Sequence, residues 1–499
     1  MIVIIFDLHV PPSFEQESYN NRVPEGIQRR GRHKTRDRLS SLDDSHALVA
    51  PYAFQLRVML TKWGDLLKFE EICKEVQCQP VPERIPRVDS YPMRFFRQEF
   101  LDNISDWLKK MEWKCAFQIE AYLRGGLLNT VDLLVGLRNP IEDVIRSYGS
   151  GASKFLYEFS SSLGTRDAGE TPSACLDRFR AAYPIIKVLK KLPPGHILCH
   201  HVVITPSRIL LEGPFTTQSN RVVRRYQNHD PILVERFVRV EFRDEDHLTY
   251  RWSGEVDGTW FLRQRVGKIL REGFEVAGRK FEFLAYSSSS LREHAVWFVS
   301  PFHDPVEGRD VNAATIRASL GDFSDLLRTP SKWAARIAQA FTATDPSVKI
   351  RRDQWEEQDD LGPHTDGVGT ISPELAEKIW DKKLKAKGLD EEGAEEDAVQ
   401  CERFPNHMDG ENRVRPSAYQ FRFLGYKGVV VVDHRLKGIK MRLRKSQRKF
   451  LVRKNAEAEF EIACSFEYPN PAHLNRFVIF VSYAPTFNFR ALISSPGPR

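Results

Sequence analysis

Basic residues are concentrated in one stretch of this 499-residue chain. Between Arg413 and Lys454 there are fourteen of them and a single acid, Asp433, so the stretch has a formal charge of +13. The whole chain carries only +7, which leaves −6 for everything else. A local charge density of this kind suits a polyanion, because it attracts and neutralises phosphate. The stretch therefore predicts a phosphate site, most simply one for nucleic acid.

Apolar and polar residues alternate within this stretch. Tyr419, Phe421 and Phe423 alternate with Gln420 and Arg422, and a period of two is typical of a half-buried strand. A charge run that is merely solvated would not need this alternation with large apolar side chains. The pattern therefore favours a strand with polar side chains on one face over a solvated charge run.

Two further strands are predicted after the first. The valine-rich run 428–433 is short enough to be a buried strand. In 439–444, three apolar side chains alternate with three cations. The sequence therefore predicts three strands close together, two of which present cations on a single face that could hold a polyanion.

The composition is that of a folded protein. Hydrophobic residues make up 41% and aromatic residues 11% of the 57.6 kDa chain, which is enough for about two to four domains. The seven cysteines are scattered without the spacing of a zinc site, which favours a reducing compartment. The apolar start MIVIIF is too short for a signal peptide, and no run reaches transmembrane length. We therefore expect no membrane contact and a location in the nucleus, the cytoplasm or both.

The first 345 residues divide into three regions of different sequence pattern. Residues 1–48 are basic, polar and without periodicity, so this leader is predicted to be disordered. Residues 49–194 contain a strand at 53–60 followed by helical stripes, and the Pro-Pro-Gly triplet at 193–195 predicts a domain boundary. Strands dominate 195–345, which ends in a pair of helices.

Two motifs leave alternatives open. The three arginines of 221–225 are predicted to lie on a helix or turn, where a solvated face is the ordinary explanation and a phosphate contact the other. The DGVG sequence within 364–380 predicts a tight turn or, less simply, a phosphate contact. A short strand and a helix follow it, with Ser372 as the N-cap and Pro373 at the first helical position.

Eight phrases, taken together and in chain order, resemble the cell-encoded RNA-dependent RNA polymerases of eukaryotic RNA silencing, of filamentous-fungal type. The similarity extends from about residue 50 to residue 476. The phrases are VAPYAFQLRVML (49–60), CAFQIEAYLRGGLLN (115–129), ITPSRILLEGPFTTQSNRVVRRY (204–226), ILREGFEVAGRKFEFLAYSSSSLREHAVWF (269–298), GDFSDLLRTPSKWAARIAQAFTAT (321–344), HTDGVGTISPELAEKI (364–379), PSAYQFRFLGYKGVVVVD (416–433) and LNR (474–476).

The resemblance implies an α+β fold. Its N-terminal region would be helical to α+β, and a strand-rich linker domain would follow. Residues 346–476 would form the first double-psi β-barrel of a two-barrel polymerase, with an acidic insertion at 385–400. In this family the first barrel carries basic residues that hold nucleotide and RNA phosphates.

The resemblance also implies which residues handle the nucleotide. Arg422 and Lys427, with Gln447 and Lys449, are similar to the nucleotide-handling positions of the family. Phosphoryl transfer is catalysed largely by positioning and charge neutralisation, so a pair of lysines beside a triphosphate suits it. The full set that we expect to bind nucleotide or RNA phosphates is Arg422, Lys427, Gln447, Lys449, Gln420, Arg442 and Arg444.

The implied partners are a single-stranded RNA template, nucleoside triphosphates and RNA-silencing proteins, and the polypeptide could form a homodimer. The complete enzyme of this family uses Mg²⁺. A second barrel binds the ion through an Asp-rich loop of the form DxDGD, because two-metal nucleotidyl transfer needs converging carboxylates.

The chain departs from the family at this loop. No DxDGD sequence occurs in it, and the acidic clusters at 244–246, 359–360 and 409–411 have other spacings. We therefore expect these 499 residues to contain neither a catalytic residue nor a metal ligand for the reaction. We also expect a chain that stops before the second barrel, with 477–499 as an out-of-family tail. Two hypotheses stay open: the N-terminal half of an RNA-directed RNA polymerase, and a non-catalytic single-stranded RNA-binding protein derived from that half.

Overall fold

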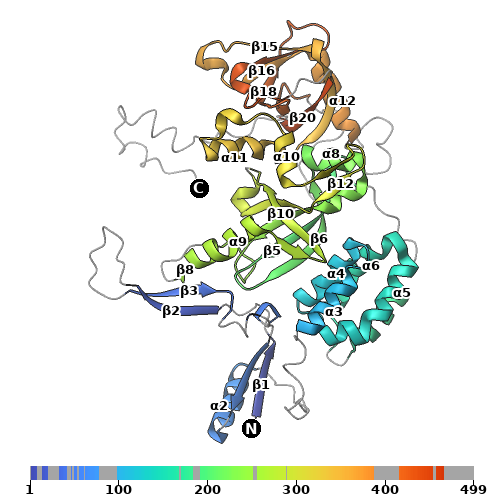
Figure 1. Cartoon of the computed structure of the whole chain (residues 1–499), viewed down its shortest axis with the longest axis vertical. Coiled ribbons are helices and arrows are strands. Elements are labelled where there is room, and N and C mark those ends of the chain that lie inside the picture. The colour runs from blue at the N-terminus through green and yellow to red at the C-terminus, as the bar shows by residue number, and fades with distance from the viewer. Residues whose placement is uncertain are drawn as a thin grey trace, which may run out of the picture. The chain divides into compact units, whose positions relative to one another are not determined.

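The chain forms two compact units (Figure 1), and each is described by itself. Unit 1 comprises Met1–Arg352, Arg422–Lys427 and Arg448–Ala463, and unit 2 comprises Asp353–Phe421, Gly428–Gln447 and Cys464–Arg499. Among the residues that the structure describes, no helix combines the length and the apolar character needed to cross a membrane. The structure is a computed structural model, and it describes residues 2–7, 14–20, 33–41, 47, 50–52, 55–60, 62–77, 98–167, 170–183, 192–250, 256–287, 289–386, 415–452 and 457–465.

Three strands lie in the N-terminal segment for which the sequence predicts disorder. β1 (Ile2–Asp7) pairs antiparallel with β4 (Gln55–Leu60), and β2 (Phe14–Asn20) pairs antiparallel with β3 (His33–Leu39). The expectation of a disordered leader is therefore wrong for these strands. Local composition missed β1 because its partner is about fifty residues away. The predicted strand at 53–60 is β4, and the predicted helix after it is α2 (Trp63–Glu75).

Five helices of unit 1 follow in the region where the sequence predicts helical stripes (Figure 1). Their apolar residues recur at helical spacing and become the buried side of each helix. In α4, for example, Phe117 and Tyr122 are completely buried. The helices are α3 (Gln98–Leu108), α4 (Trp113–Arg124), α5 (Arg138–Tyr148), α6 (Ala152–Gly164) and α7 (Pro172–Ala182).

A six-stranded sheet begins where the sequence predicts the change to strands. Its order is β6-β5-β7-β11-β10-β9, and every neighbouring pair is antiparallel except the parallel pair β5 and β7. The strands are β5 (His196–Ile204), β6 (Ile209–Gln218), β7 (Phe237–Phe242), β9 (Phe274–Val276), β10 (Arg279–Ala285) and β11 (Ala295–Val299).

Both faces of this sheet are buried. From β11, Val296 and Phe298 pack into one core with residues of the helices α3 to α7, whereas Trp297 and Val299 pack into a second core. Successive side chains of a strand point to opposite faces, so one strand supplies both cores. Residues before and after the expected boundary at 193–195 share the first core. That triplet therefore marks a change of secondary structure and not a gap in the packing.

The second core is covered by short helices that the sequence predicts correctly. Asn312 caps the first of the predicted helix pair, and Pro330 opens the second. The arginines of 221–225 lie on a helix, α8. The remaining elements of unit 1 are α8 (Arg221–His229), α9 (Gly267–Glu272), α10 (Ala313–Ser319), α11 (Pro330–Ala338), β8 (Val256–Asp257), β12 (Phe302–Asp304), β13 (Arg309–Val311), β14 (Asp345–Arg351) and β20 (Glu457–Ser465).

His200 is buried against the rings of Trp113 and Phe117 of the first core, at centroid distances of 4.9 and 4.6 Å. Burial lowers its pKa to about 3, helped by the nearby charge of His201. The unfolded chain therefore binds a proton below pH 6.5 that the folded chain does not bind. Linkage then requires stability to fall as the pH falls from about 6.5 towards 3.

Replacing His200 with leucine is expected to remove most of this acid sensitivity. Between pH 7 and 4.5 the loss attributable to one such histidine is about 2–3 kcal/mol, measured by urea unfolding at each pH. The control is His303→Leu at an exposed histidine, which should keep the parental pH dependence. A parental dependence in His200→Leu would mean that other groups cause the acid sensitivity.

In unit 2, the predicted basic strands belong to a mixed sheet. The order within this unit is β17-β18-β16-β19-β15, and β17 and β18 continue along the chain into unit 1. β16 is parallel to β18 and antiparallel to β19, and β19 is parallel to β15. The elements are β15 (Trp355–Gln358), β16 (Val368–Ile371), α12 (Pro373–Ala386), β17 (Ala418–Phe423), β18 (Tyr426–Val432) and β19 (Met441–Arg444).

The alternating pattern survives in this sheet, but two details differ from the prediction. Tyr419 and Phe421 are completely buried, as expected. The run 428–433 is not buried throughout, because Val430 is fully buried while Val431 exposes 36% of its surface. In addition, β16 lies between β18 and β19, so only the first two of the three predicted strands, β17 and β18, are direct neighbours.

The start of α12 agrees with the sequence. The Oγ of Ser372 accepts a hydrogen bond from the backbone N–H of Leu375 at 3.3 Å, which makes it the predicted N-cap. Most of the expected acidic insertion at 385–400 lies outside the described residues, as does the expected tail at 477–499. The fold is mixed α+β with strand-rich sheets, as predicted at that level.

Candidate functional site

A tight turn in unit 1 joins the end of β17 to the start of β18. Its two central residues, Leu424 and Gly425, have positive φ angles of 42° and 81°, the backbone geometry of a two-residue hairpin. The backbone N–H of Lys449 donates a hydrogen bond to the carbonyl of Gly425 at 2.9 Å. A Cβ on Gly425 would lie 2.4 Å from the carbonyl oxygen of Phe450, so only glycine lets the two segments approach this closely.

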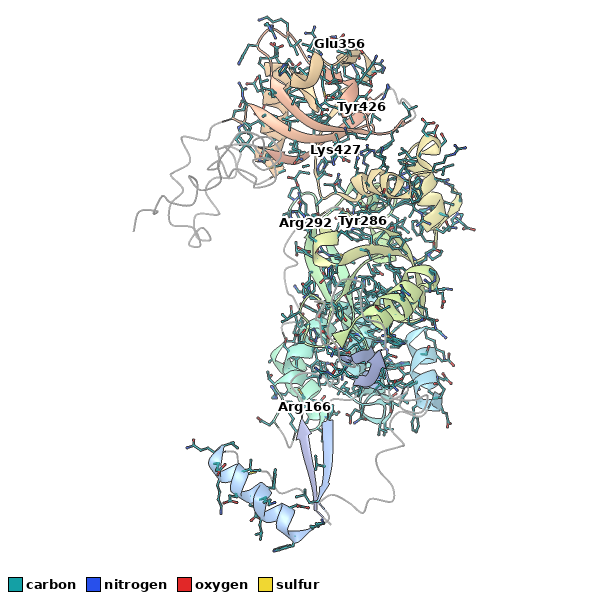
Figure 2. The ribbon with its side chains drawn as sticks, turned by 90° about the vertical axis from the view of Figure 1, so that its left-hand side faces the viewer. Arg166, Tyr286, Arg292, Glu356, Tyr426 and Lys427 are labelled. Carbon is teal, nitrogen blue, oxygen red and sulfur yellow. The ribbon has the colours of Figure 1, made fainter. Side chains whose placement is uncertain are left out.

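This approach gathers basic side chains. Arg422 and Lys427 flank the turn (Figure 2 labels Lys427), and Lys449 lies on the segment bonded to it. Burial lowers the pKa of Lys427, and the charges of Arg422, Lys449 and Arg336 lower it further. We call these four residues the turn cluster. Because like charges disfavour one another, a bound anion would stabilise the charged form of the lysine.

A buried carboxylate holds the arginines beside the turn cluster. Glu461 is paired with Arg224 at 3.1 Å and with Arg221 at 3.6 Å. Arg224 also donates to the side-chain hydroxyl of Thr344 at 2.9 Å. Burial and the charge of Arg221 lower the pKa of the Arg422 guanidinium, and the charge of Glu461 opposes that shift. Neither explanation offered for the arginines of 221–225 therefore applies to Arg224. It is buried and joins α8 to Glu461 and Thr344.

Gln447 lies in unit 2, and its surroundings differ from the expectation. The residue is completely buried. Its amide nitrogen donates to the carbonyls of Gly367 and Val429 at 3.2 and 3.0 Å, and its amide oxygen accepts from the backbone N–H of Arg444 at 2.8 Å. The direct contact with nucleotide that we expected for Gln447 is therefore incompatible with this conformation. Gln447 is a positioning residue that connects the strands around it.

The remaining predicted cations of unit 2 face acidic and carbonyl groups. Arg442 is paired with Glu356 of β15 at 2.7 Å, and Arg444 donates to the carbonyl oxygen of Asp359 at 2.8 Å. Gln420 is half-buried on β17. The predicted cationic face therefore has an acid beside Arg442, because β15 pairs with β19. The sequence could not reveal this pairing, since the two strands are about 85 residues apart.

The described residues contain one cluster of groups that could be tested against a metal ion. Ligand atoms of His229, Asp304 and Glu307 lie within 4.8 Å of one another in unit 1. Asp304 already accepts hydrogen bonds from His229, at 2.8 Å, and from two backbone N–H groups. Glu307 is paired with Arg225 and Arg309. This donor set does not fit Mg²⁺, because its carboxylates are neutralised by neighbours and a single imidazole is a poor magnesium ligand.

The comparisons with known proteins agree with the sequence phrases. The family model for RNA dependent RNA polymerase, RdRP, matches residues 204–481, which is more than half of the chain. The chain belongs to the RNA-dependent RNA polymerase family. All residues of the turn cluster and Glu461 lie inside the matched range. The match also includes the first residues of the expected out-of-family tail.

Named relatives cover the same part of the chain. RNA-dependent RNA polymerase 1 of Arabidopsis thaliana is 33% identical over 301 residues, which are 58% of this chain and 23% of that protein. RNA-dependent RNA polymerase 1 of Schizosaccharomyces pombe is 29% identical over 378 residues, 74% of this chain and 27% of that protein. The chain thus matches about a quarter of the length of these relatives.

One solved structure is similar at a low level. It is the RNA dependent RNA polymerase QDE-1 from Thielavia terrestris, with 18% sequence identity and a TM-score of 0.38 over 57% of this chain and 30% of that one. A likeness of this size decides nothing about the fold. Membership of the family rests on the sequence match alone.

Sequence reasoning missed two members of the site in unit 1. Arg336 lies on α11, where the sequence indicated only one helix of a pair, and Glu461 lies on β20, outside the basic stretch. Arg336 belongs to one of the phrases that resemble the family, and this was the only signal that could have drawn attention to it. Glu461 has no such signal, because its role depends on Arg221 and Arg224.

Proposed function

We propose that this chain supplies the phosphate-binding wall of an RNA-directed RNA polymerase, which makes double-stranded RNA from single-stranded RNA for RNA silencing. One observation carries the proposal. The turn between β17 and β18 brings Lys427 beside Lys449 through the hydrogen bond from Lys449 to Gly425, with Arg422 and Arg336 close enough to lower the pKa of Lys427. Family membership supports RNA and nucleoside triphosphates as the ligands.

In this proposal the turn cluster acts by neutralising charge and by positioning. Lys427 and Lys449 would hold phosphate oxygens. Arg422, which is only 6% exposed, would contribute a buried positive charge to the electrostatic potential of the site. Groups that are already in place when negative charge develops contribute most to phosphoryl transfer. No step is assigned to a metal, because the cluster of His229, Asp304 and Glu307 does not fit Mg²⁺.

We further propose that residues 346–476 belong to the first double-psi β-barrel of a two-barrel polymerase. The support is the sequence resemblance over this range and the mixed sheet of unit 2. Its two parallel pairs, β16 with β18 and β15 with β19, need crossover connections instead of hairpins. A second candidate function is a non-catalytic single-stranded RNA-binding protein, for which the missing DxDGD sequence is the motive. It has less support than the polymerase, because the family match is to RNA dependent RNA polymerase.

Salt-dependent RNA binding tests the proposal. We expect the affinity for a labelled 12-nucleotide single-stranded RNA, measured by fluorescence anisotropy from 50 to 300 mM KCl, to fall with a log–log slope of about −0.7 for each neutralised phosphate. The double variant Lys427→Ala/Lys449→Ala should lose two such contacts. Its slope should therefore be shallower by about 1.4.

The matched control removes the same charge elsewhere. Lys378→Ala/Lys382→Ala alters two exposed lysines of α12 and should leave the slope unchanged. Circular dichroism and the thermal midpoint check that each variant is folded. An unchanged slope in a folded Lys427→Ala/Lys449→Ala protein would refute the role of the turn cluster.

A further inference from the structure

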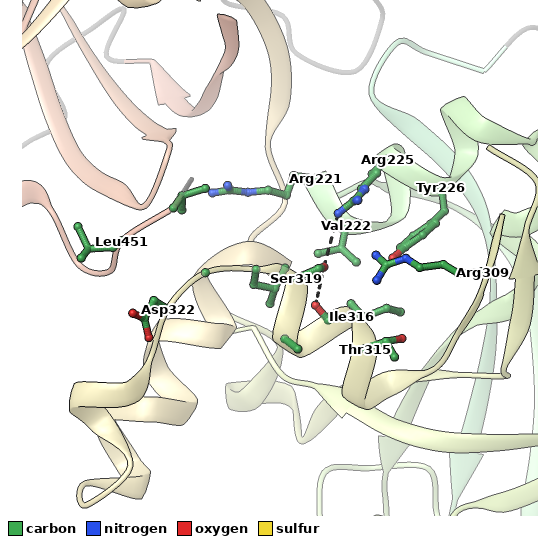
Figure 3. Close-up of a pocket in the computed structure, with 14 residues that line it drawn as sticks. Arg221, Val222, Arg225, Tyr226, Arg309, Thr315, Ile316, Ser319, Asp322 and Leu451 are labelled. Atoms are coloured by element: carbon green, nitrogen blue, oxygen red, sulfur yellow. Dashed lines mark hydrogen bonds between the residues drawn. The ribbon is translucent and has the colours of Figure 1, made fainter. Parts of the chain in front are cut away.

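A large cavity in unit 1 lies between α8, β13 and α10 and is not part of the turn cluster (Figure 3). Its volume is about 1240 Å³. Pockets for small ligands in proteins measure about 300–1,000 Å³, so the cavity can hold a group as large as a nucleotide.

One side of the cavity is cationic and preorganised. The guanidinium groups of Arg225 and Arg309 are both paired with Glu307, and Arg225 also donates to the hydroxyl of Ser319 at 3.5 Å (Figure 3). Burial alone would raise the pKa of Glu307, but the hydrogen bonds from Arg309 and Arg225 outweigh it and hold the pKa below its usual range. Glu307 is therefore an ionised carboxylate that holds both guanidinium groups in fixed positions.

Arg225 and Arg309 together carry two positive charges, and Glu307 neutralises only one of them. Arg221 lines the same cavity, so the excess is larger still, although Arg221 also pairs with Glu461. A guanidinium has five N–H donors in a planar fork, and a pairing with one carboxylate leaves donors for a phosphate oxygen. Their side chains stay accessible, with 41% of Arg225 and 47% of Arg309 exposed.

Another side of the cavity is apolar and partly open to solvent. It is lined by Ala318, Leu320, Leu451 and Val452, and Leu451 exposes 56% of its surface. Apolar surface beside fixed cations matches a ligand with a charged end and a flat, weakly polar remainder. A nucleotide has this form, because its phosphate suits the arginines and its sugar and base suit the apolar side.

The backbone connects this cavity to the turn cluster. Leu451 follows Lys449 by two residues, and the backbone N–H of Asp322 donates to the carbonyl of Leu451 at 2.9 Å. Gly321 permits this contact, since a Cβ there would lie 2.7 Å from the same carbonyl. One short segment therefore contributes to both sites within unit 1.

We propose that this cavity binds one nucleotide unit of single-stranded RNA, with its phosphate on Arg225, Arg309 and Arg221 and its sugar and base on the apolar side. The inference rests on the proposed function for the class of ligand, but it assigns a second phosphate subsite apart from Lys427 and Lys449. The simpler alternative is that the arginines only join α8 to β13. The two explanations predict different RNA affinities for a variant in which a bulky side chain fills the cavity and all the arginines are retained.

Two variants test the cavity with the same labelled 12-nucleotide RNA. Arg309→Gln removes one accessible cation and should weaken binding about tenfold at low salt and make the slope shallower by about 0.7. Ser319→Trp fills the cavity from the exposed end of α10 and should weaken binding by a similar factor. It removes the 3.5 Å hydrogen bond from Arg225 but keeps every lining arginine and the pairing of Arg225 and Arg309 with Glu307. A purely structural role for the arginines predicts no loss in a folded Ser319→Trp protein.

The control and a second ligand sharpen the test. Arg292→Gln removes an exposed arginine that does not line the cavity (Figure 2 labels Arg292) and should bind RNA like the parent. Uridine monophosphate should compete for RNA more strongly than inorganic phosphate does, because only the nucleotide uses the apolar side. Equal competition by the two would reduce the site to a bare anion site and overturn the assignment of a nucleotide.

The outcomes separate this inference from the proposed function. If Arg309→Gln and Ser319→Trp bind RNA like the parent while Lys427→Ala/Lys449→Ala has a shallower slope, the cavity assignment fails and the proposed function stands. If the parent chain binds no RNA at any salt concentration, the proposed function fails and the cavity assignment fails with it.

Discussion

Replacing Glu461 with alanine is expected to lower the free energy of unfolding by about 3–5 kcal/mol. Glu461 is only 6% exposed and accepts the guanidinium of Arg224 at 3.1 Å. Its removal would leave the buried charge of Arg224 close to Arg221 without a carboxylate between them. An uncompensated buried charge is among the most destabilising changes that one substitution can make. Urea unfolding, followed by circular dichroism, measures the difference.

Two comparison variants separate this effect from ordinary surface electrostatics. Glu457→Ala removes an exposed carboxylate from the same strand, where the pairing with Lys349 is 3.9 Å long, and should cost less than about 1 kcal/mol. Adding Arg224→Met to Glu461→Ala should restore part of the lost stability, because the buried charge is removed together with its partner. If Glu461→Ala costs no more than Glu457→Ala, the buried pair does not hold this part of unit 1 together.

The chain by itself is expected to bind single-stranded RNA without copying it. The turn cluster supplies cations for phosphates, whereas nucleotidyl transfer also needs carboxylates that converge on metal ions. The sequence contains no DxDGD motif, and the carboxylates of Asp304 and Glu307 already have partners. Incubation with a single-stranded template, four nucleoside triphosphates and Mg²⁺, followed by denaturing electrophoresis of labelled product, measures the activity.

The same preparation must first show salt-dependent RNA binding, so that a lack of product cannot be blamed on unfolded protein. The Lys427→Ala/Lys449→Ala variant is the second control. A contaminating polymerase would give equal product with both proteins. Product that depends on Lys427 and Lys449 would contradict the expectation and would place the missing carboxylates within these 499 residues.

Short-range pattern predicted much of the local structure. The alternation of Tyr419, Phe421 and Phe423 became a buried strand face, since the period of two needs no information beyond the strand itself. Ser372 and Pro373 marked the start of α12 for the same reason, because an N-cap bonds to the first turn of its own helix. The proximity of Lys427 to Lys449 was also expected, although from the family resemblance and not from spacing.

Long-range contacts account for the failures. β1 and β2 were missed because each depends on a partner strand that composition does not reveal. The pairing of Arg442 with Glu356 was not foreseen, because it depends on β15 lying next to β19. Gln447 was expected to contact nucleotide, yet the sheet closes around its amide.

Residue types and spacing thus showed that the stretch from 416 to 450 is a basic, strand-forming segment suited to phosphate. Which of its cations pair with acids was decided only by the tertiary structure. Which carboxylate pairs with a cation depends on distance in space and not on separation in the sequence. The placement of Arg336 beside Lys427, and of Glu461 beside Arg221 and Arg224, comes from helices and strands that are far apart in the sequence.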